Sequence, residues 1–110
     1  MSGLVVLANF KVYVNRGAII ELDSRYKFPA VYPERRFAID GGPISYALSN
    51  IEHFRLGAGY VDRILRGEKS ADLPVQAPTK YETVINLKTA KSLGLTIPEA
   101  LLATADEVIQ

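Results

Sequence analysis

The amino end of the chain carries a strand, a helix and a short strand in immediate succession, and this pattern limits the possible folds more than any other feature. Residues 3–10 form a short apolar run, typical of a parallel strand buried on both faces. Apolar residues then recur at three- and four-residue intervals from about 12 to 27, which predicts a helix. Pro29 ends that helix, and residues 30–32 can form only a very short strand. This βαβ pattern predicts an α/β fold of three-layer type with a mostly parallel sheet.

The best-marked helix follows a third predicted strand at residues 44–48. Ser49 and, three residues later, Glu52 form a capping box that begins this helix, and Gly67 ends it. One face of the helix is apolar, and Gly57 lies on it, so we expect this face to be buried.

The rest of the chain alternates between extended and helical patterns. Residues 68–78 contain two prolines and no period, which indicates an extended crossing segment, and the alternation over 79–87 predicts a strand. Asn86 can cap a short helix after that strand. Thr96 and Glu99 form a second capping box, which predicts a terminal helix with an apolar stripe continuing almost to the last residue.

Composition excludes several classes of protein. The 110 residues fit one domain, so we expect residues 1–110 to form a single α/β unit. Thirteen basic against twelve acidic residues give a net charge of +1 without a dense basic cluster, which argues against a nucleic-acid partner. The chain has no cysteine, which excludes disulfides and zinc–thiolate sites. No apolar run has the length of a membrane span, and the first residues lack the basic leader of a signal peptide.

Residues that could perform catalysis are few. His53 is the only histidine and has no nucleophile or orienting partner suggested by the sequence. The carboxylates nearest to it in sequence are single and do not have the spacing of a metal site. Gly41 and Gly42 lack the residues of a phosphate-binding loop and indicate a turn instead. We therefore expect no catalytic residue, no metal and no cofactor, and a protein that is not an enzyme.

Polar and aromatic residues near the ends of the predicted strands are the candidates for binding a ligand, because open α/β sheets bind ligands beyond the carboxyl ends of parallel strands. These residues are Asn9, Tyr32, Ser45 and Tyr46. Each has a structural alternative: Asn9 can cap a helix, Tyr32 can fill the gap between two prolines, and Ser45 can be an ordinary strand residue. The basic residues at 34–36 are typical of a solvated turn, although an arginine there could hold an anion.

A series of motifs in this order resembles a known family. The motifs are Pro-Ala-Val-Tyr-Pro at 29–33, Gly-Gly at 41–42 with Ser-Tyr at 45–46, Tyr-Val-Asp-Arg-Ile-Leu-Arg-Gly at 60–67, Ala-Asp-Leu-Pro-Val at 71–75, Pro-Thr-Lys at 78–80, Val-Ile-Asn-Leu-Lys-Thr-Ala-Lys at 84–91, Leu-Gly-Leu-Thr-Ile-Pro at 93–98 and Ala-Asp-Glu-Val-Ile at 105–109. Together they resemble the carboxyl-terminal part of the ABC-transporter substrate-binding proteins associated with tryptophan and tyrosine uptake.

The resemblance implies the carboxyl-terminal portion of a type I periplasmic-binding-protein fold, in which two α/β lobes close on a small molecule. Residues 1–48 would resemble the end of the second lobe and residues 49–110 the segment returning to the first. The implied partners are a small organic solute, such as an aromatic amino acid, and an ABC permease. The implied location is periplasmic or extracytoplasmic, or cytoplasmic if the chain is expressed without a leader.

Two positions depart from the family pattern, and the short chain allows a second interpretation. Pro43 follows the two glycines and Ala47 follows Tyr46, which removes a backbone donor and a flexible glycine from this loop. Unpaired sheet edges favour a homodimer, which could be swapped through residues 68–78. The alternative function is accordingly a stand-alone homo-oligomeric interaction or regulatory protein that has lost ligand binding.

Overall fold

The computed structural model describes residues 3–76 and 80–110. These residues form two compact units, one made of residues 1–47 and 82–110 and the other of residues 48–81, in each case without the undescribed positions. The sequence suggested a single unit in which residues 49–110 resemble the segment that returns to the first lobe. The structure groups the chain differently, since residues 82–110 join the sheet built by the amino-terminal residues.

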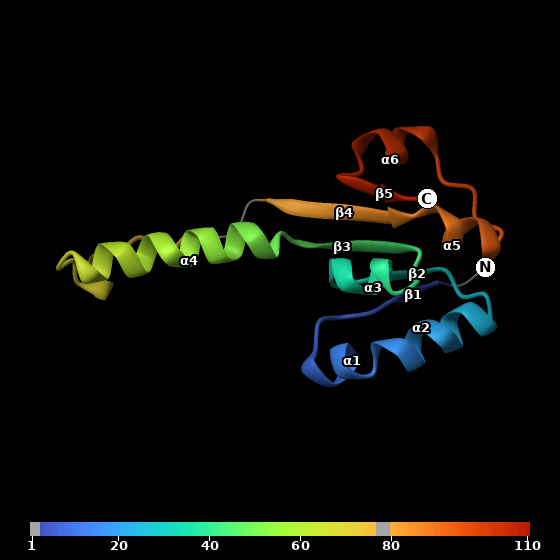
Figure 1. Ribbon diagram of the computed structural model, residues 1–110, viewed down its shortest axis with the longest axis horizontal. Helices are drawn as coiled ribbons and strands as arrows, with labels where there is room; N and C mark the ends of the chain where they lie inside the picture. Colours follow the sequence, from blue (N-terminus) through green and yellow to red (C-terminus); the bar gives the residue numbers. More distant parts are fainter. Residues whose placement is uncertain (1–2, 77–79) are drawn as a thin grey trace. The chain divides into compact units, whose positions relative to one another are not determined.

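The first unit contains a five-stranded sheet, in the part of the chain that the structure describes, with the order β1-β2-β3-β4-β5. Its strands are β1 (Leu4–Val5), β2 (Ala30–Tyr32), β3 (Ile44–Leu48), β4 (Tyr81–Asn86) and β5 (Glu107–Ile109). The pairs β1–β2, β2–β3 and β4–β5 are parallel. Figure 1 shows β4 running opposite to β3, in agreement with the bond from the Asn86 amide to the Pro43 carbonyl. The predicted α/β fold with a mostly parallel sheet is confirmed.

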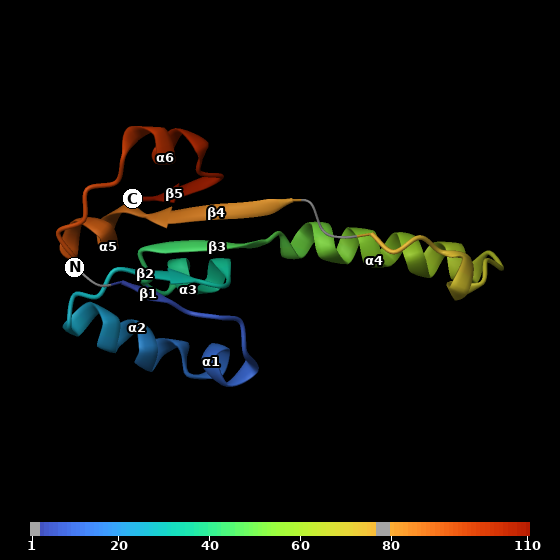
Figure 2. The ribbon, with the colours of Figure 1, turned by 180° about the vertical axis from the view of Figure 1, so that it is seen from behind.

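Short helices connect the strands of this unit. They are α1 (Phe10–Val14), α2 (Arg16–Arg25), α3 (Arg35–Ile39), α5 (Leu87–Ser92) and α6 (Glu99–Thr104). Figures 1 and 2 show α1 and α2 on the β1 side of the sheet and α6 on the β5 side. The sequence predicted one helix over 12–27, but the structure has two, α1 and α2, which meet at Asn15. Gly17, two positions later, has low helix propensity.

The core of the first unit lies between β2 and the helices α2 and α3. Ile20, Ala30, Tyr32 and Phe37 are buried together, with partly buried residues of α1 and α2 and of the connection after β1 packed against them. The Tyr32 and Phe37 rings are stacked with their centroids 5.1 Å apart. Gly42 makes this packing possible, since a Cβ atom there would lie 2.6 Å from the Tyr32 ring. The turn predicted at Gly41–Gly42 is confirmed, and Gly41 has a φ of 121°, which favours glycine.

Both ends of the first unit differ from the sequence-based expectation. The strand expected to be buried on both faces is β1, which spans only two residues, and Val5 is 69% exposed. Among the described residues β1 pairs only with β2, so it is an edge strand. The terminal helix ends at Thr104 instead of continuing, and Thr96 does not cap it. Residues 107–109 form β5, because Asp106 turns the chain by bonding to the backbone of Thr83 and the β-branched residues after it pair with β4.

The second unit consists of α4 (Asn50–Leu65), a 3₁₀ turn at Ser70–Asp72 and the segment that returns toward β4. The predicted cap is confirmed: the Ser49 hydroxyl accepts a hydrogen bond from the Glu52 amide at 3.4 Å. Gly67, with a φ of 101°, follows the end of the helix as expected. The Ser49 amide bonds to the Lys80 carbonyl at 3.2 Å, which ties the two ends of this unit together. Thr79, where the sequence placed the start of β4, lies outside the described residues.

Candidate functional site

The edge of the sheet at which β1, β2 and β3 end is the natural place for a ligand. These three strands are parallel, so their carboxyl ends lie along one edge. Since β4 runs in the opposite direction, it begins at this same edge. All four candidate residues belong to strands β2 and β3 or to the connection after β1.

Tyr32 is the last residue of β2 and is 1% exposed. Its hydroxyl donates a hydrogen bond to the Asp23 carboxylate, which is also buried. Burial, together with the hydrogen bond to Asp23, raises the pKa of Tyr32 well above that of a free tyrosine. Tyr32 therefore remains protonated at neutral pH and fixes the end of α2 to β2. The sequence offered a packing role for Tyr32 as the alternative to ligand binding, and the buried Tyr32 has such a role. The sequence did not indicate Asp23 as its hydrogen-bond partner.

Ser45 and Tyr46 are neighbours in β3 but differ in burial. Ser45 pairs with Tyr32 in the register of β2 and β3, so the two side chains lie on the same face of the sheet. Ser45 is 1% exposed, and its Oγ has no hydrogen-bond partner among the described residues. Tyr46 points to the opposite face and is 55% exposed. The candidates Tyr32 and Ser45 are thus brought together, and Tyr46 is separated from them by the thickness of the sheet.

Asn9 is exposed and forms the N-cap of α1. Its Oδ1 accepts a hydrogen bond from the Lys11 amide at 2.9 Å, as the capping alternative anticipates. The capping bond fixes the side chain on α1, but Asn9 stays accessible to solvent.

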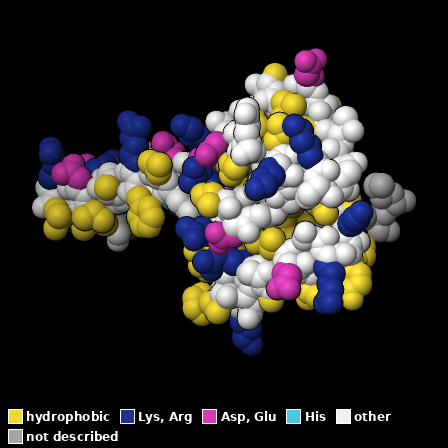
Figure 3. All heavy atoms as spheres, turned by 45° about the vertical axis from the view of Figure 1, so that its right-hand side comes forward, with side chains coloured by type: hydrophobic (Ala, Val, Ile, Leu, Met, Phe, Trp, Pro, Cys, Tyr) yellow, Lys and Arg dark blue, Asp and Glu magenta, His cyan; other side chains and the backbone are white. Residues whose placement is uncertain are grey.

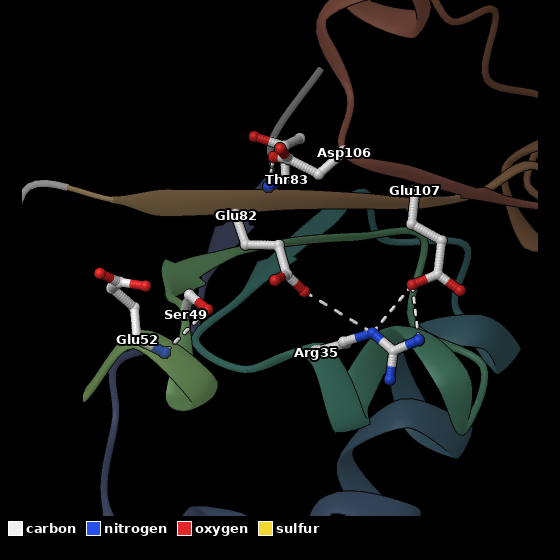
Figure 4. A network of polar contacts seen from close by, with 7 residues as sticks. All are labelled: Arg35, Ser49, Glu52, Glu82, Thr83, Asp106 and Glu107. Atoms are coloured by element: carbon white, nitrogen blue, oxygen red, sulfur yellow. Dashed lines mark hydrogen bonds and ion pairs between the residues drawn. The ribbon is translucent and has the colours of Figure 1, made fainter. Parts of the chain in front are cut away.

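A charged network that the sequence did not single out lies at the same edge of the sheet, as Figure 4 shows. Arg35, the first residue of α3, donates two hydrogen bonds to one oxygen of Glu107, at 2.8 Å from Nε and 2.6 Å from Nη2. Its Nε also lies 3.6 Å from the Glu82 carboxylate. The network connects α3 to the first residue of β5 and to β4. The sequence favoured a solvated turn at 34–36, and Arg35 is indeed half exposed, but its partners are 47 or more positions away in the sequence and could not be recognised by spacing.

A second arginine cluster lies between α2 and the end of α3. Arg16 donates a hydrogen bond to Asp40 at 2.8 Å, and Arg36 does so at 3.2 Å. The hydrogen bond from Arg16 lowers the pKa of the Asp40 carboxyl. The Arg16 guanidinium also lies 4.6 Å from the centre of the Tyr13 ring. Through these two bonds to its Oδ2, Asp40 connects α2 to the end of α3.

Among residues 3–76 and 80–110, no group of three or more histidine, cysteine, aspartate or glutamate side chains could hold a metal ion. No helix in the described ranges is long and apolar enough to cross a membrane.

The comparison with protein families decides where this fold belongs. A model of the ABC transporter substrate-binding protein family matches residues 1–109. The chain belongs to this family. The resemblance suggested by the sequence motifs is thereby confirmed, and the family to which it points is one of solute-binding proteins. No curated protein matches the sequence at a significant level.

Solved structures agree with the family. A conserved domain protein from Vibrio cholerae is 29% identical and has a TM-score of 0.89. An ABC domain from Streptococcus pneumoniae, solved in complex with L-Trp, is 27% identical and has a TM-score of 0.87. A ligand-free, open substrate-binding protein with adhesive properties from Clostridium difficile is 18% identical with a TM-score of 0.69 and shows the fold alone.

The chain is short relative to these structures. The alignments cover 96–97% of the chain but 36% of each of the three proteins. The chain therefore corresponds to about a third of a substrate-binding protein of this family.

Proposed function

We propose that this chain acts in the solute-binding component of an ABC importer and binds a small organic solute, with aromatic amino acids as the leading class. The observation that carries the proposal is the family match over residues 1–109. The L-Trp complex of the pneumococcal protein, which is 27% identical, supports the aromatic class. An ABC permease would be the partner, and the location would be extracytoplasmic, as is typical of the family.

The lobe assignment is also a proposal, refined by the arrangement of the units. Residues 1–47 and 82–110 share one sheet and would belong to the second lobe, whereas residues 48–81 form a unit of their own and would belong to the first. The solute would bind at the edge where β1, β2 and β3 end. Of the four candidates, Tyr46 and Asn9 are exposed and would contact the solute, and the buried Tyr32 and Ser45 would support the edge from within.

Thermal unfolding in the presence of amino acids tests the proposal. We expect L-Trp, L-Tyr or L-Phe to raise the melting temperature of the chain, whereas L-Leu at the same concentration should not. A ligand at about 100 times its Kd stabilises a protein by about 2.7 kcal/mol, so weak binding remains measurable with about 10 mM ligand. Replacing Tyr46 by Ala should abolish the shift, and Tyr26→Ala, at another exposed tyrosine, should retain it. A melting temperature that no solute changes would refute solute binding by this chain.

A second candidate function, a homo-oligomeric interaction protein that has lost ligand binding, is favoured by one observation. The second unit leaves large apolar side chains exposed along α4, among them Ile51 and Phe54. Contiguous exposed apolar surface is uncommon in monomeric proteins and marks surfaces of interaction. A homodimer whose melting temperature ignores every solute would support this candidate over the first.

A further inference from the structure

One arginine of the first unit is shared by two carboxylates. Arg35 donates two hydrogen bonds to one oxygen of Glu107, and a Glu82 oxygen lies 3.6 Å from Nε of the same guanidinium (Figure 4). The network therefore carries two negative charges and one positive charge. All three residues belong to the first unit, so the geometry of the network does not depend on how the two units are arranged.

The three residues meet at the edge of the sheet where the solute is proposed to bind. Arg35 comes three residues after the end of β2, and β2 ends at this edge. Glu82 is the second residue of β4, which begins there. Glu107 is the first residue of β5, and β5 begins at the same edge because it is parallel to β4. A solute at this edge therefore meets the charge of the network.

Glu82 is the less well compensated of the two carboxylates. Its side chain is 28% exposed, whereas that of Glu107 is 40% exposed. The Nε of Arg35 donates to Glu107, and the distance of 3.6 Å to Glu82 is an ion pair but not a hydrogen bond. Partly buried charges interact more strongly than charges in bulk water. The surplus negative charge of the network can therefore attract a further cation.

A single primary ammonium group fits this surplus better than other cations do. Its three N–H donors can reach two carboxylates at once. Calcium and magnesium take six or more oxygen ligands, and no acidic cluster within 3–76 and 80–110 is large enough to hold a metal ion. Figure 3 shows basic and acidic side chains scattered over the first unit on the face drawn, without a large patch of one charge. A cation with several charges would find no extended acidic surface on that face.

We propose that Glu82 and Glu107 hold the ammonium group of the solute and that Arg35 weakens their hold by its own charge. This role rests on the proposed binding of a solute at this edge, and it adds which chemical group of the solute the chain recognises. The edge accordingly selects aromatic amines and amino acids over aromatic carboxylates that lack an amine.

Three indole compounds with different head groups test the role. Tryptamine carries the ammonium alone, L-Trp carries both the ammonium and the carboxylate, and indole-3-propionate carries the carboxylate alone. Calorimetric titration of the full chain at about 20 mM salt keeps the screening of exposed charges small. We expect tryptamine and L-Trp to bind, and indole-3-propionate to bind at least about tenfold more weakly than tryptamine, because a third carboxylate at the network opposes association.

Three substitutions separate recognition of charge from a structural role of the network. Glu82→Gln and Glu107→Gln keep the size of the side chain, and each should weaken tryptamine binding at least about fivefold, because a charge-assisted hydrogen bond is lost. Arg35→Gln should strengthen tryptamine binding at least about threefold, because it removes the like charge. Glu21→Gln, at an exposed carboxylate of α2, is the matched control and should leave the affinity unchanged. Circular dichroism compares the folding of all variants.

The outcomes distinguish this role from solute binding itself. A chain that binds none of the three compounds would overturn both the proposed function and the role of the network. If L-Trp binds but indole-3-propionate binds as tightly as tryptamine, or if neither glutamate substitution changes the affinity for tryptamine, solute binding stands and ammonium recognition is overturned. Weaker tryptamine binding by folded Arg35→Gln would give the network a structural role instead and would overturn the proposal as well.

Discussion

Replacing Tyr32 by Phe removes one hydroxyl from the core and leaves its ring in place. That hydroxyl donates the hydrogen bond to Asp23, whose side chain is buried and has no other hydrogen bond or ion pair in the described part of the chain. A hydrogen bond to a charged group contributes about 1.5–3 kcal/mol. We expect Tyr32→Phe to lower the free energy of unfolding by about that amount, because the carboxylate then stays in a buried place without its donor.

The assay is thermal unfolding of the full chain followed by circular dichroism. A loss of about 2 kcal/mol corresponds to a melting temperature about 8–16 °C lower for a unit of fewer than 100 residues. Tyr26→Phe is the matched control, since Tyr26 is 65% exposed and its loss of a hydroxyl should change stability by less than about 0.5 kcal/mol.

A double-mutant cycle separates the bond from the packing of the ring. Asp23→Ala removes the acceptor, so the combined Asp23→Ala and Tyr32→Phe variant leaves no charge buried without a donor. We expect the double variant to cost less than the sum of the two single changes, with a coupling of about 1 kcal/mol or more. Strictly additive costs, or a Tyr32→Phe variant as stable as Tyr26→Phe, would refute the reasoning.

The remaining predictions concern a glycine pair and the alkaline limb of stability. Gly42→Ala should destabilise the chain by about 1–3 kcal/mol, because the new Cβ would lie 2.6 Å from the Tyr32 ring. Gly59→Ala has nothing within 4 Å of its Cβ and should stabilise α4 by up to about 1 kcal/mol. Thermal unfolding measures both changes, and equal effects of the two substitutions would contradict the prediction. Because the pKa of Tyr32 is raised in the folded chain, the unfolded chain loses the hydroxyl proton near pH 10 while the folded chain keeps it. The contribution of the Tyr32 hydroxyl to stability is therefore fully present below about pH 10 and is lost at higher pH. The stability difference between the unchanged chain and Tyr32→Phe should therefore stay constant up to about pH 10 and shrink between about pH 10 and pH 12, as urea unfolding would measure. A difference that stays constant across this range would contradict the prediction.

Local signals predicted the elements that local chemistry determines. The cap at Ser49 and the cap at Asn86, whose Oδ1 accepts from the Thr89 amide at 3.1 Å, were both recognisable because capping needs residues only three positions apart. The strand at 44–48 and the glycine turn before it were predicted for the same reason. Local spacing could not show that residues 107–109 pair with β4, since their helical stripe and their strand pairing involve the same apolar residues.

The sequence could place the four candidate residues along one edge of the sheet, but it could not predict their contacts. The rule for parallel strands placed the four candidates on or just after the strands that end at this edge. It could not predict that Asp23 would hold the Tyr32 hydroxyl, or that Arg35 would meet Glu82 and Glu107, because these partners come from distant parts of the chain. The burial of a helix face depends on what packs against it and cannot be predicted from the apolar pattern alone. The apolar face of α4 was expected to be buried and is exposed.

The two units differ in how they are stabilised, and this difference bears on the chain as a whole. The first unit has a core of its own around Tyr32 and Phe37, whereas no residue of α4, all of which the structure describes, is buried. Isolated helices of about this length are marginal in water, and most helical stability in proteins comes from packing an apolar face. The apolar face of α4 must therefore be covered by other protein for the second unit to be as stable as the first. Hydrogen exchange measures this directly: in dilute solution the amides of α4 should exchange much faster than those of β2 and β3. Exchange in α4 as slow as that in β2 and β3 would show that the second unit needs no such cover.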